Sequence, residues 1–394
     1  MSKLSIFTNS LLPCKLMAGI YLHIPFCKQA CSYCNFHFST LLKYKEDVLQ
    51  AMLLEIARQQ DFFIEKTNIN TIYFGGGTPS ILSAGDINRL LAQIHKYFDV
   101  QINAEITLEA NPDDLTLEYL LALKKETPIN RFSIGIQSFV DADLQYMHRA
   151  HNAAQAKACV EHAQHVGFHN LSVDLIYGTP TLNATQCLQN IQTVIDMQVP
   201  HVSCYALTVE EKTELASLIK KRKKEAPTDE AMTAQFDILT AQMRAHHYIH
   251  YEISNFGKEG HFAQHNTNYW KGIPYLGIGP SAHSFDGQKR YWNIANNAIY
   301  LKKIKTNEAH FDSELLTETD KYNEYIMTSI RTIFGVDIRK LQHDFEEKYV
   351  QHFLREIKLF KTKNWIEENN GIYRLTDKGK LFCDHISAHL FIEN

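Results

Sequence analysis

Apolar runs of strand length alternate with amphipathic helical segments over most of the chain. Most of the apolar runs lack polar alternation, which is typical of parallel strands buried on both faces. The predicted strands are Gly19–Ile24, Thr71–Phe74, Glu105–Glu109, Arg131–Ile136, Leu171–Ile176 and His201–Leu207. The predicted helices are Tyr44–Glu65, Ala84–Phe98, Leu115–Lys125, Ala153–Val166, Ala184–Met197 and Asp229–His247. This alternation predicts an α/β fold with a parallel barrel, or part of one.

The pattern changes after about residue 300. Three helical segments precede two short strands, and an Asn-Gly pair between these strands is a strong hairpin signal. The expected elements are helices Glu314–Thr332, Ile338–Phe345 and Gln351–Phe360 and strands Trp365–Asn369 and Ile372–Leu375. They predict an α+β winged-helix-like domain. Its Lys and Glu residues are mixed, which favours a packing or interaction role over DNA binding.

Composition narrows the class of protein. The chain has 394 residues, 45% of them hydrophobic, which suits a barrel-sized domain with a smaller one beside it. The net charge of −4 indicates no nucleic-acid surface, and no apolar run approaches the roughly 20 residues that span a bilayer. The stretch Ile6–Leu12 is too short and polar for a signal peptide, so we expect a cytoplasmic protein. Met1 and Met17 are both candidate starts.

Three of the eight cysteines fall within eight positions, directly after the first predicted strand. Thiolates at Cys27, Cys31 and Cys34 can hold three irons of a four-iron cluster and leave the fourth iron open to another ligand. Zinc is the alternative, with His23 or His37 as its fourth ligand. The spacing of three residues and then two differs from that of zinc ribbons and favours the cluster. The other cysteines lie among apolar neighbours, which indicates a reduced compartment.

The Cys-x-x-x-Cys-x-x-Cys loop resembles the signature of the radical S-adenosylmethionine (SAM) superfamily. The segment Tyr21-Leu-His-Ile-Pro-Phe-Cys27 is similar to the subgroup that contains oxygen-independent coproporphyrinogen oxidase and the HemW proteins, and the resemblance extends from Gly19 to the C-terminus. It implies a 4Fe–4S cluster, SAM bound to the open iron, and a partial (β/α)6 TIM-like barrel. We expect an N-terminal extension (1–18), the partial barrel (19–250), a barrel-closing segment (251–310) and the C-terminal winged-helix-like domain (311–394).

Further motifs follow the later strands in order, at the strand ends where the active sites of such barrels lie. They are Gly75-Gly76-Gly77-Thr78-Pro79, Glu109-Ala-Asn-Pro112, Gly135-Ile-Gln137-Ser138 and Asp174-Leu-Ile-Tyr-Gly-Thr-Pro180. The resemblance implies that the glycines approach the amino group of SAM, that Asp174 binds its ribose and that Arg149 pairs with its carboxylate. The implied SAM-contacting residues are Tyr21, Tyr33, Gly76, Gly77, Thr78, Glu109, Gln137, Arg149, Asp174 and Ala206.

Two features distinguish members of the subgroup. The oxidases have a fourth cysteine two positions after the third, where this chain has Phe36, and a longer arm before the first strand. The segment His265-Asn266-Thr-Asn-Tyr269-Trp270 matches a motif associated with the HemW proteins. An imidazole beside two aromatic rings suits haem, with His265 on the iron and the rings of Tyr269 and Trp270 on the porphyrin. A polar loop with core aromatics is the plainer interpretation, and His250 and His261 are competing ligands.

The resemblance implies a haem chaperone that binds haem, a 4Fe–4S cluster and SAM. It would deliver haem to respiratory haem proteins, with transient proximity to the membrane, and it allows for a homodimer. The alternatives are an oxygen-independent coproporphyrinogen III dehydrogenase and a zinc-binding structural protein. The sequence leaves open whether SAM is cleaved productively.

Overall fold

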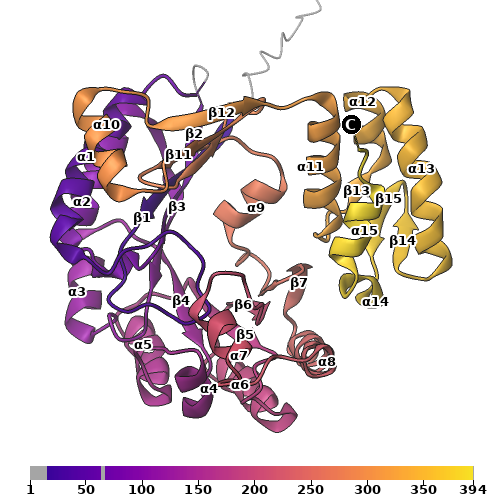
Figure 1. The fold of residues 1–394 in the computed structure, drawn as a ribbon, viewed down its shortest axis with the longest axis horizontal. Coiled ribbons are helices and arrows are strands. Elements are labelled where there is room, and N and C mark those ends of the chain that lie inside the picture. Colours follow the sequence, from indigo (N-terminus) through magenta and orange to yellow (C-terminus); the bar gives the residue numbers. More distant parts are fainter. Residues whose placement is uncertain (1–15, 64–66, 394) are drawn as a thin grey trace, which may run out of the picture.

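A computed structural model describes residues 16–63 and 67–393. Most of the expected extension 1–18, the candidate start Met1, the stretch Ile6–Leu12 and residue Glu65 lie outside the described residues. Met17 is the first residue of the first strand. The chain forms a large curved sheet with helices on its outer face and a smaller domain beside it (Figure 1).

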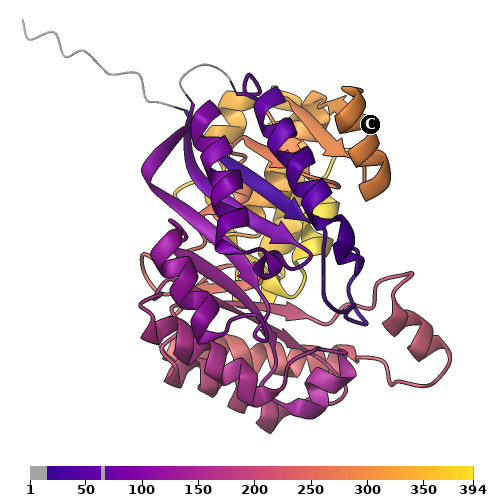
Figure 2. The ribbon, with the colours of Figure 1, turned by 90° about the vertical axis from the view of Figure 1, so that its left-hand side faces the viewer.

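Six parallel strands in chain order form the centre of the large sheet. They are β1 (Met17–Ile24), β2 (Asn68–Gly76), β3 (Asp99–Ala110), β4 (Arg131–Gln137), β5 (Leu171–Tyr177) and β6 (His201–Ala206). The main helices between them are α1 (Lys45–Arg58), α2 (Ala84–Tyr97), α3 (Leu117–Glu126), α5 (Ala153–His165), α6 (Ala184–Asp196) and α8 (Asp229–Ala245). Figure 2 shows helices lined up on the outer face of the strands. The predicted partial (β/α)6 barrel is confirmed.

Shorter helices lie in the connections of this barrel: η1 (Leu42–Tyr44), η2 (Pro79–Ile81), α4 (Asp141–Tyr146) and α7 (Glu214–Lys220). Several of the longer barrel helices, although not α1, begin where the side chain of an N-cap residue accepts a hydrogen bond from the first turn. Ser83, Asn152 and Asn183 do so for α2, α5 and α6, each in a reciprocal capping box. Local sequence therefore sets these starts.

Further strands extend the sheet at both ends, giving the order β12-β11-β10-β9-β1-β2-β3-β4-β5-β6-β8-β7. After β6, the chain forms β7 (Ile249–Glu252), β8 (Asn255–Gly257), α9 (Gln264–Trp270), β9 (Tyr275–Ile278), β10 (His283–Phe285), β11 (Lys289–Asn293), α10 (Asn297–Thr306) and β12 (Phe311–Leu315). Strand β9 pairs in parallel with β1, and β10 to β12 continue antiparallel. Helix α9 lies between the sheet and the C-terminal domain (Figure 1).

The C-terminal domain has its own hydrophobic core. It contains α11 (Glu318–Ile330), β13 (Val336–Asp337), α12 (Ile338–Asp344), α13 (Glu347–Thr362), β14 (Ile366–Asn369), β15 (Ile372–Leu375), α14 (Asp377–Lys380) and α15 (Cys383–Leu390). The predicted hairpin is confirmed: β14 and β15 pair antiparallel, and Asn370 and Gly371 both have positive φ, as a type I′ turn requires. The α+β winged-helix-like character is confirmed as well.

The prediction of a helix from Glu314 was wrong. Glu314 and Leu315 belong to β12, and α11 starts only after Thr317, whose hydroxyl caps it in a box with Asp320. Most of β12 is exposed, so the strand has no apolar pattern to reveal it. The large sheet therefore runs on to Leu315 instead of ending at residue 310. The first predicted helix, Tyr44–Glu65, was too long, because α1 ends at Arg58.

Glu55 on α1 fixes the returning chain to the barrel. Its side chain is 0% exposed. One carboxylate oxygen accepts hydrogen bonds from the amide of Asn293 (2.7 Å) and from Nε2 of His310 (2.9 Å). The other accepts them from the backbone N–H of Gly279 (2.8 Å) and the hydroxyl of Tyr300 (2.5 Å). Four segments of the chain thus converge on one carboxylate.

We predict that Glu55→Gln destabilises the protein by about 3 kcal/mol, because the amide group would face two buried donors. The thermal unfolding midpoint should fall by several degrees, measured by circular dichroism. The matched control is Glu46→Gln on the same helix, whose partner Arg89 forms an exposed ion pair worth at most about 1 kcal/mol. Equal midpoints for the two variants would contradict this role for Glu55.

Candidate cluster and cofactor site

The three clustered cysteines lie in the loop that follows β1, at the carboxyl edge of the parallel strands. The side chains of Cys27, Cys31 and Cys34 are half-buried. The loop is held by backbone hydrogen bonds from Cys27 N to Ser39 O (3.1 Å) and from Ser32 N to Met147 O (3.2 Å). The thiols therefore sit on a loop braced at both ends and open on one side.

Two polar side chains reach the sulfur atoms. The hydroxyl of Thr78 donates to Sγ of Cys27 (3.4 Å), and Nη1 of Arg149 donates to Sγ of Cys31 (3.1 Å). Burial raises the pKa of Cys27 to about 11 and also raises the pKa of Cys34, while the Arg149 cation opposes both shifts. Three sulfur donors beside a buried cation suit an iron–sulfur cluster, whose thiolates need compensating positive charge.

The zinc alternative would need a fourth ligand, and His23 is not free to provide it. Among residues 16–63 and 67–393, no three His, Cys, Asp or Glu side chains gather around one ion-sized position. His23 Nδ1 lies 3.2 Å from the hydroxyl of Tyr21, and its Nε2 lies 2.9 Å from the carbonyl of His37. His37 Nε2 in turn pairs with Asn297 (2.8 Å). Since both nitrogens of His23 and one of His37 are engaged, the geometry favours the cluster.

Asn111 joins the two contacts to sulfur, and sequence reasoning missed it. Its side-chain N–H donates to the hydroxyl of Thr78 (3.2 Å), and its oxygen accepts from Nη2 of Arg149 (2.8 Å). Arg149 also donates to the carbonyl of Gly135 (2.6 Å). A continuous path thus runs from Cys27 to Cys31. The position of Asn111 in the Glu-Ala-Asn-Pro motif was the only sequence feature that could have pointed to it. Its contact with Arg149 could not be foreseen, because the two residues are far apart in the sequence.

The glycine segment lies directly against the cluster loop. A Cβ at Gly77 would stand 2.6 Å from the carbonyl oxygen of Phe26, so only glycine fits there. Gly76 has φ +107° and donates its N–H to Oε2 of Glu109 (3.2 Å). The glycines therefore bring the end of β2 close to the cysteines and to the acidic end of β3.

Two buried carboxylates face the same region from β3 and β5. Burial raises the pKa of Glu109 to about 7, and repulsion by Asp174 adds to this, while hydrogen bonds from Tyr73 (2.7 Å) and Gly76 oppose it. Burial likewise raises the pKa of Asp174 to about 6, against hydrogen bonds from Ser203 and Ser133. Two close carboxylates of this kind suit a ligand that brings positive charge and hydroxyl groups.

Other expected SAM-contacting residues adjoin these carboxylates. Gln137 at the end of β4 has φ +69°, and its buried Oε1 has no hydrogen-bond partner among the described residues, nor has Nε of Arg149. Unpaired buried polar atoms are costly unless a ligand satisfies them. Burial raises the pKa of Tyr33 against the nearby Arg149 cation, and Tyr21 stacks on Tyr73 with ring centroids 6.1 Å apart. Ala206 ends β6. The donors and acceptors present fit SAM.

The structure does not present His265 to a haem as an axial ligand. The side chain is 2% exposed. Its Nδ1 lies 2.8 Å from the hydroxyl of Thr71, and its Nε2 lies 2.8 Å from the hydroxyl of Tyr269. Burial lowers the pKa of His265 to about 3, so the ring is neutral. Both nitrogens are engaged inside the barrel, where His265 joins α9 to β2.

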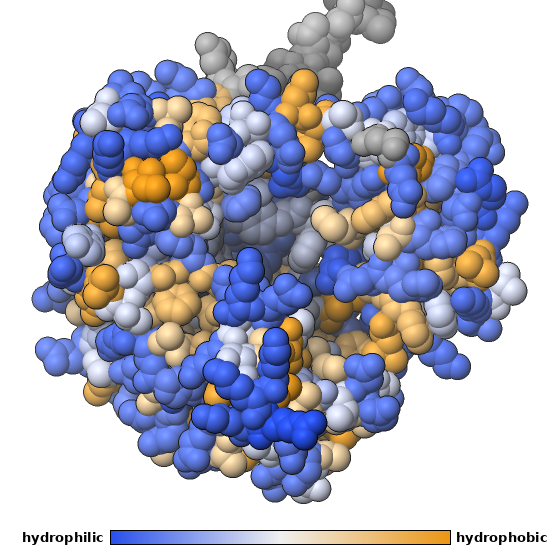
Figure 3. All heavy atoms as spheres, in the orientation of Figure 1, coloured by the Kyte–Doolittle hydropathy of each residue, from blue (hydrophilic) through white to orange (hydrophobic). Residues whose placement is uncertain are grey.

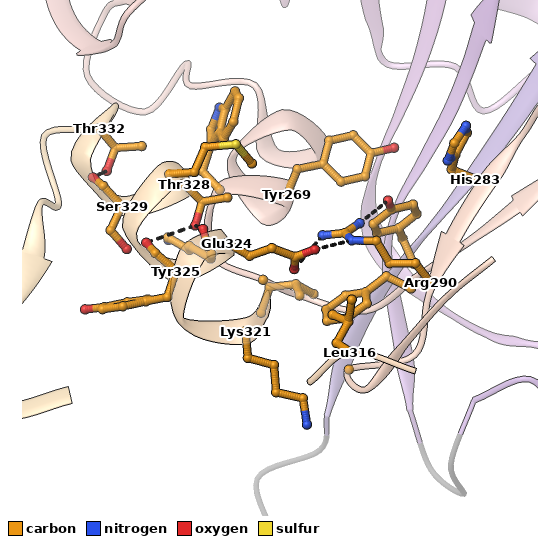
Figure 4. A pocket seen from close by; sticks show the side chains of 18 of the residues that line it. Tyr269, His283, Arg290, Leu316, Lys321, Glu324, Tyr325, Thr328, Ser329 and Thr332 are labelled. Carbon is orange, nitrogen blue, oxygen red and sulfur yellow. Dashed lines mark hydrogen bonds and ion pairs between the residues drawn. The ribbon is translucent and has the colours of Figure 1, made fainter. Parts of the chain in front are cut away.

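A cavity of about 1010 Å³ opens between the barrel and the C-terminal domain, seen as the central hollow in Figure 3. Tyr269 and Trp270, the aromatic residues of the motif, line it, but His250, His261 and His265 do not. Tyr21 and His23 of β1 line its barrel side, so the cavity borders Tyr21, one of the residues expected to contact SAM. Figure 4 shows the wall formed by α11 and β11. The motif thus contributes to this cavity through its rings.

Known protein families match the barrel and the C-terminal domain separately. Residues 21–193 match the radical SAM superfamily, which implies a 4Fe–4S cluster and SAM, and residues 316–382 match the HemN C-terminal domain. Coproporphyrinogen III oxidase (HemN) from Escherichia coli superposes with a TM-score of 0.82 at 21% identity, over 96% of this chain and 90% of that one. At this identity the match shows the fold alone.

Curated relatives match at higher identity. The heme chaperone HemW of Lactococcus lactis is 32% identical over 91% of this chain and 93% of its own length. The HemW of Bacillus subtilis is 30% identical over 94% and 98%, and that of Haemophilus influenzae is 32% identical over 93% and 96%. With this identity over nearly the whole of both sequences, the chain belongs to the HemW family of radical SAM proteins.

Proposed function

We propose that this protein is a haem chaperone, which binds haem in the cavity between the barrel and the C-terminal domain and passes it to haem proteins. The observation that carries the proposal is the cavity itself, of about 1010 Å³, which is lined by Tyr21, a residue expected to contact SAM. Its size is at the upper end of ligand pockets in proteins. The relatives named as heme chaperones support the same function.

The lining of the cavity suits a flat apolar macrocycle with two carboxylates. Tyr269, Trp270 and Phe285 offer aromatic surface, and Met327 offers an adaptable thioether. Cationic side chains also line the cavity, and Lys321 among them forms no ion pair within the described part of the chain. A lysine of this kind can pair with a propionate of haem.

Phe36 favours haem binding over the oxidase alternative. It occupies the position of the oxidases' fourth cysteine, its side chain is 69% exposed, and it lines the cavity. An exposed aromatic ring on the cluster loop adds apolar surface where a macrocycle would lie. Such a residue serves haem binding without taking part in decarboxylation.

We assign the SAM contacts to the residues around Glu109, Gln137, Arg149 and Asp174. In this arrangement Glu109 would hold the amino group, Asp174 the ribose hydroxyls and Arg149 the carboxylate. When bound, the cluster and SAM supply one-electron cleavage of the sulfonium. Because Tyr21 borders both sites, we propose that SAM controls haem binding or release.

The proposal also covers the compartment, the recipients and the oligomeric state of the protein. All seven cysteines in the described residues are free thiols, which fits the reducing cytoplasm. Among the described helices, none has the length and apolar character needed to cross a bilayer. We propose that the recipients are respiratory haem proteins, approached transiently at the membrane, and that the protein works as a homodimer.

We predict that Met327→Trp weakens haem binding by about tenfold, because the larger ring takes up space in the cavity. The measurement is titration of the purified full chain with ferric haem, followed by absorption. Met327 is 38% exposed, so the substitution should leave the fold intact. Leu359→Trp, on an exposed position of α13 outside the cavity, is the matched control.

The competing activity is tested with the same protein. The wild type should transfer haem to an apo haem protein and should not convert coproporphyrinogen III when SAM and a reductant are supplied. Conversion at an enzyme-like rate would refute the chaperone proposal, and so would a wild-type chain that binds no haem.

We predict that SAM affinity falls as pH is lowered through about 7, the pKa of Glu109. The ionised carboxylate pairs with the ammonium group of SAM, and protonation below this pKa removes that attraction. The dissociation constant should rise by up to about tenfold per pH unit between pH 7 and pH 6. Anaerobic equilibrium dialysis of the cluster-loaded protein measures it.

Two variants distinguish the titration of Glu109 from a general effect of pH on SAM binding. Glu109→Gln should bind SAM more weakly at pH 8 and lose most of the pH dependence above pH 6.5. Glu118→Gln, at an exposed position at the start of α3, should behave as the wild type. A wild-type affinity that stays constant from pH 8 to pH 6 would count against Glu109 as the amino-group contact.

A further inference from the structure

Three histidines line the cavity: His23, His37 and His283. Both ring nitrogens of His23 are engaged, and the ring is 6% exposed. His37 uses Nε2 on the side chain of Asn297, which ties the cluster loop to α10. The ring of His23 cannot turn to a new ligand without giving up a contact that holds the cluster loop, and His37 has only Nδ1 left while it keeps its bond to Asn297.

His283 differs from the other two in burial and in contacts. Its side chain is exposed, and among the described residues no hydrogen bond reaches either of its ring nitrogens. Its neighbours Ala282 and Ser284 are buried, so the alternation of a strand turns His283 toward the cavity. Figure 4 shows it on the side of the pocket away from Ser329 of α11.

The backbone that carries His283 is held firmly. In the register of β10 and β11, His283 pairs with Trp292. The hydroxyl of Ser284 accepts a hydrogen bond from the N–H of Gly277 on β9 (2.8 Å). A Cβ at Gly277 would lie 2.0 Å from the carbonyl oxygen of His283, so the two strands are in close contact. The backbone position from which the imidazole projects is therefore fixed before any ligand arrives, which lowers the entropic cost of binding.

The electrostatic surroundings keep His283 in the form that binds metal. Partial burial, and then the nearby Arg290 cation, lower the pKa of His283 below its usual range. The ring is neutral at physiological pH, with a lone pair available. Arg290 itself is held by both carboxylate oxygens of Glu324 on α11 and by the hydroxyl of Tyr275.

We propose that His283 coordinates the haem iron in this cavity. The inference rests on the proposed haem-binding function and names the ligand within that site. Its imidazole would reach the iron from the β10 side of the cavity, while the rings of Tyr269 and Trp270 contact the porphyrin from α9. His265 keeps its place inside the barrel and does not touch the iron.

The test compares haem with metal-free protoporphyrin IX in the full chain. His283→Ala should shift the absorption bands of bound ferric haem and weaken its binding by at least about tenfold. It should leave protoporphyrin binding unchanged, because that ligand has no iron to coordinate. Added imidazole should restore the wild-type haem spectrum in His283→Ala. His343→Ala, an exposed histidine on α12 outside the cavity, is the matched control.

Failure of the His283 assignment and failure of the proposed function give different results in these titrations. If the wild type binds haem and His283→Ala gives the same spectrum and affinity, the assignment of His283 is overturned while the chaperone proposal stands. A spectral change in His37→Ala with none in His283→Ala would overturn the assignment in the same way. If the wild type binds neither haem nor protoporphyrin, the proposed function itself fails. If Met327→Trp weakens both ligands while His283→Ala weakens haem alone, both proposals are supported.

Discussion

The return of the chain to β1 through β9 is the constraint on which both sites depend. The hydrogen bonds between Gly19–Leu22 and Tyr275–Ile278 put a segment from late in the sequence next to the strand that leads into the cluster loop. The carboxylate of Glu55 secures this return, because it binds donors from the β9–β10 turn, β11, α10 and the approach to β12. Without that pairing, the cavity would lose its barrel side.

The same arrangement links the residues expected to bind SAM to the cavity through direct contacts. Glu109 accepts a hydrogen bond from Tyr73, whose ring stacks on His265 with centroids 5.1 Å apart and on Tyr21. Tyr21 reaches His23 at the cavity wall. A ligand that changes the charge at Glu109 therefore acts on one end of a packed stack whose other end borders the cavity. Coupling of this kind is reciprocal, so haem would affect SAM binding as much as SAM affects haem binding.

Hydrophobic periodicity was enough to predict the six βα units, because those elements bury continuous apolar faces. The C-terminal hairpin was predicted from its diagnostic Asn-Gly turn. Periodicity failed for β12, whose exposed residues pair only through the backbone. The cysteines and the strand-end motifs were identified by spacing and resemblance. Asn111 was seen in its motif, but its link between Thr78 and Arg149 joins residues that only the folded barrel brings together.

His265, the histidine of the motif, shows why a sequence motif alone did not reveal what the side chain does. Glu105 accepts hydrogen bonds from the backbone N–H groups of Gln264 (2.9 Å) and His265 (3.2 Å), which fixes the start of α9 in the barrel. The imidazole of His265 then bridges Thr71 and Tyr269. A buried ring with both nitrogens satisfied sets the direction of the helix, and the helix turns Tyr269 and Trp270 to the cavity. In the proposed function, the histidine of the motif would serve haem binding by positioning its neighbours, and the iron would be left to an imidazole that the cavity exposes.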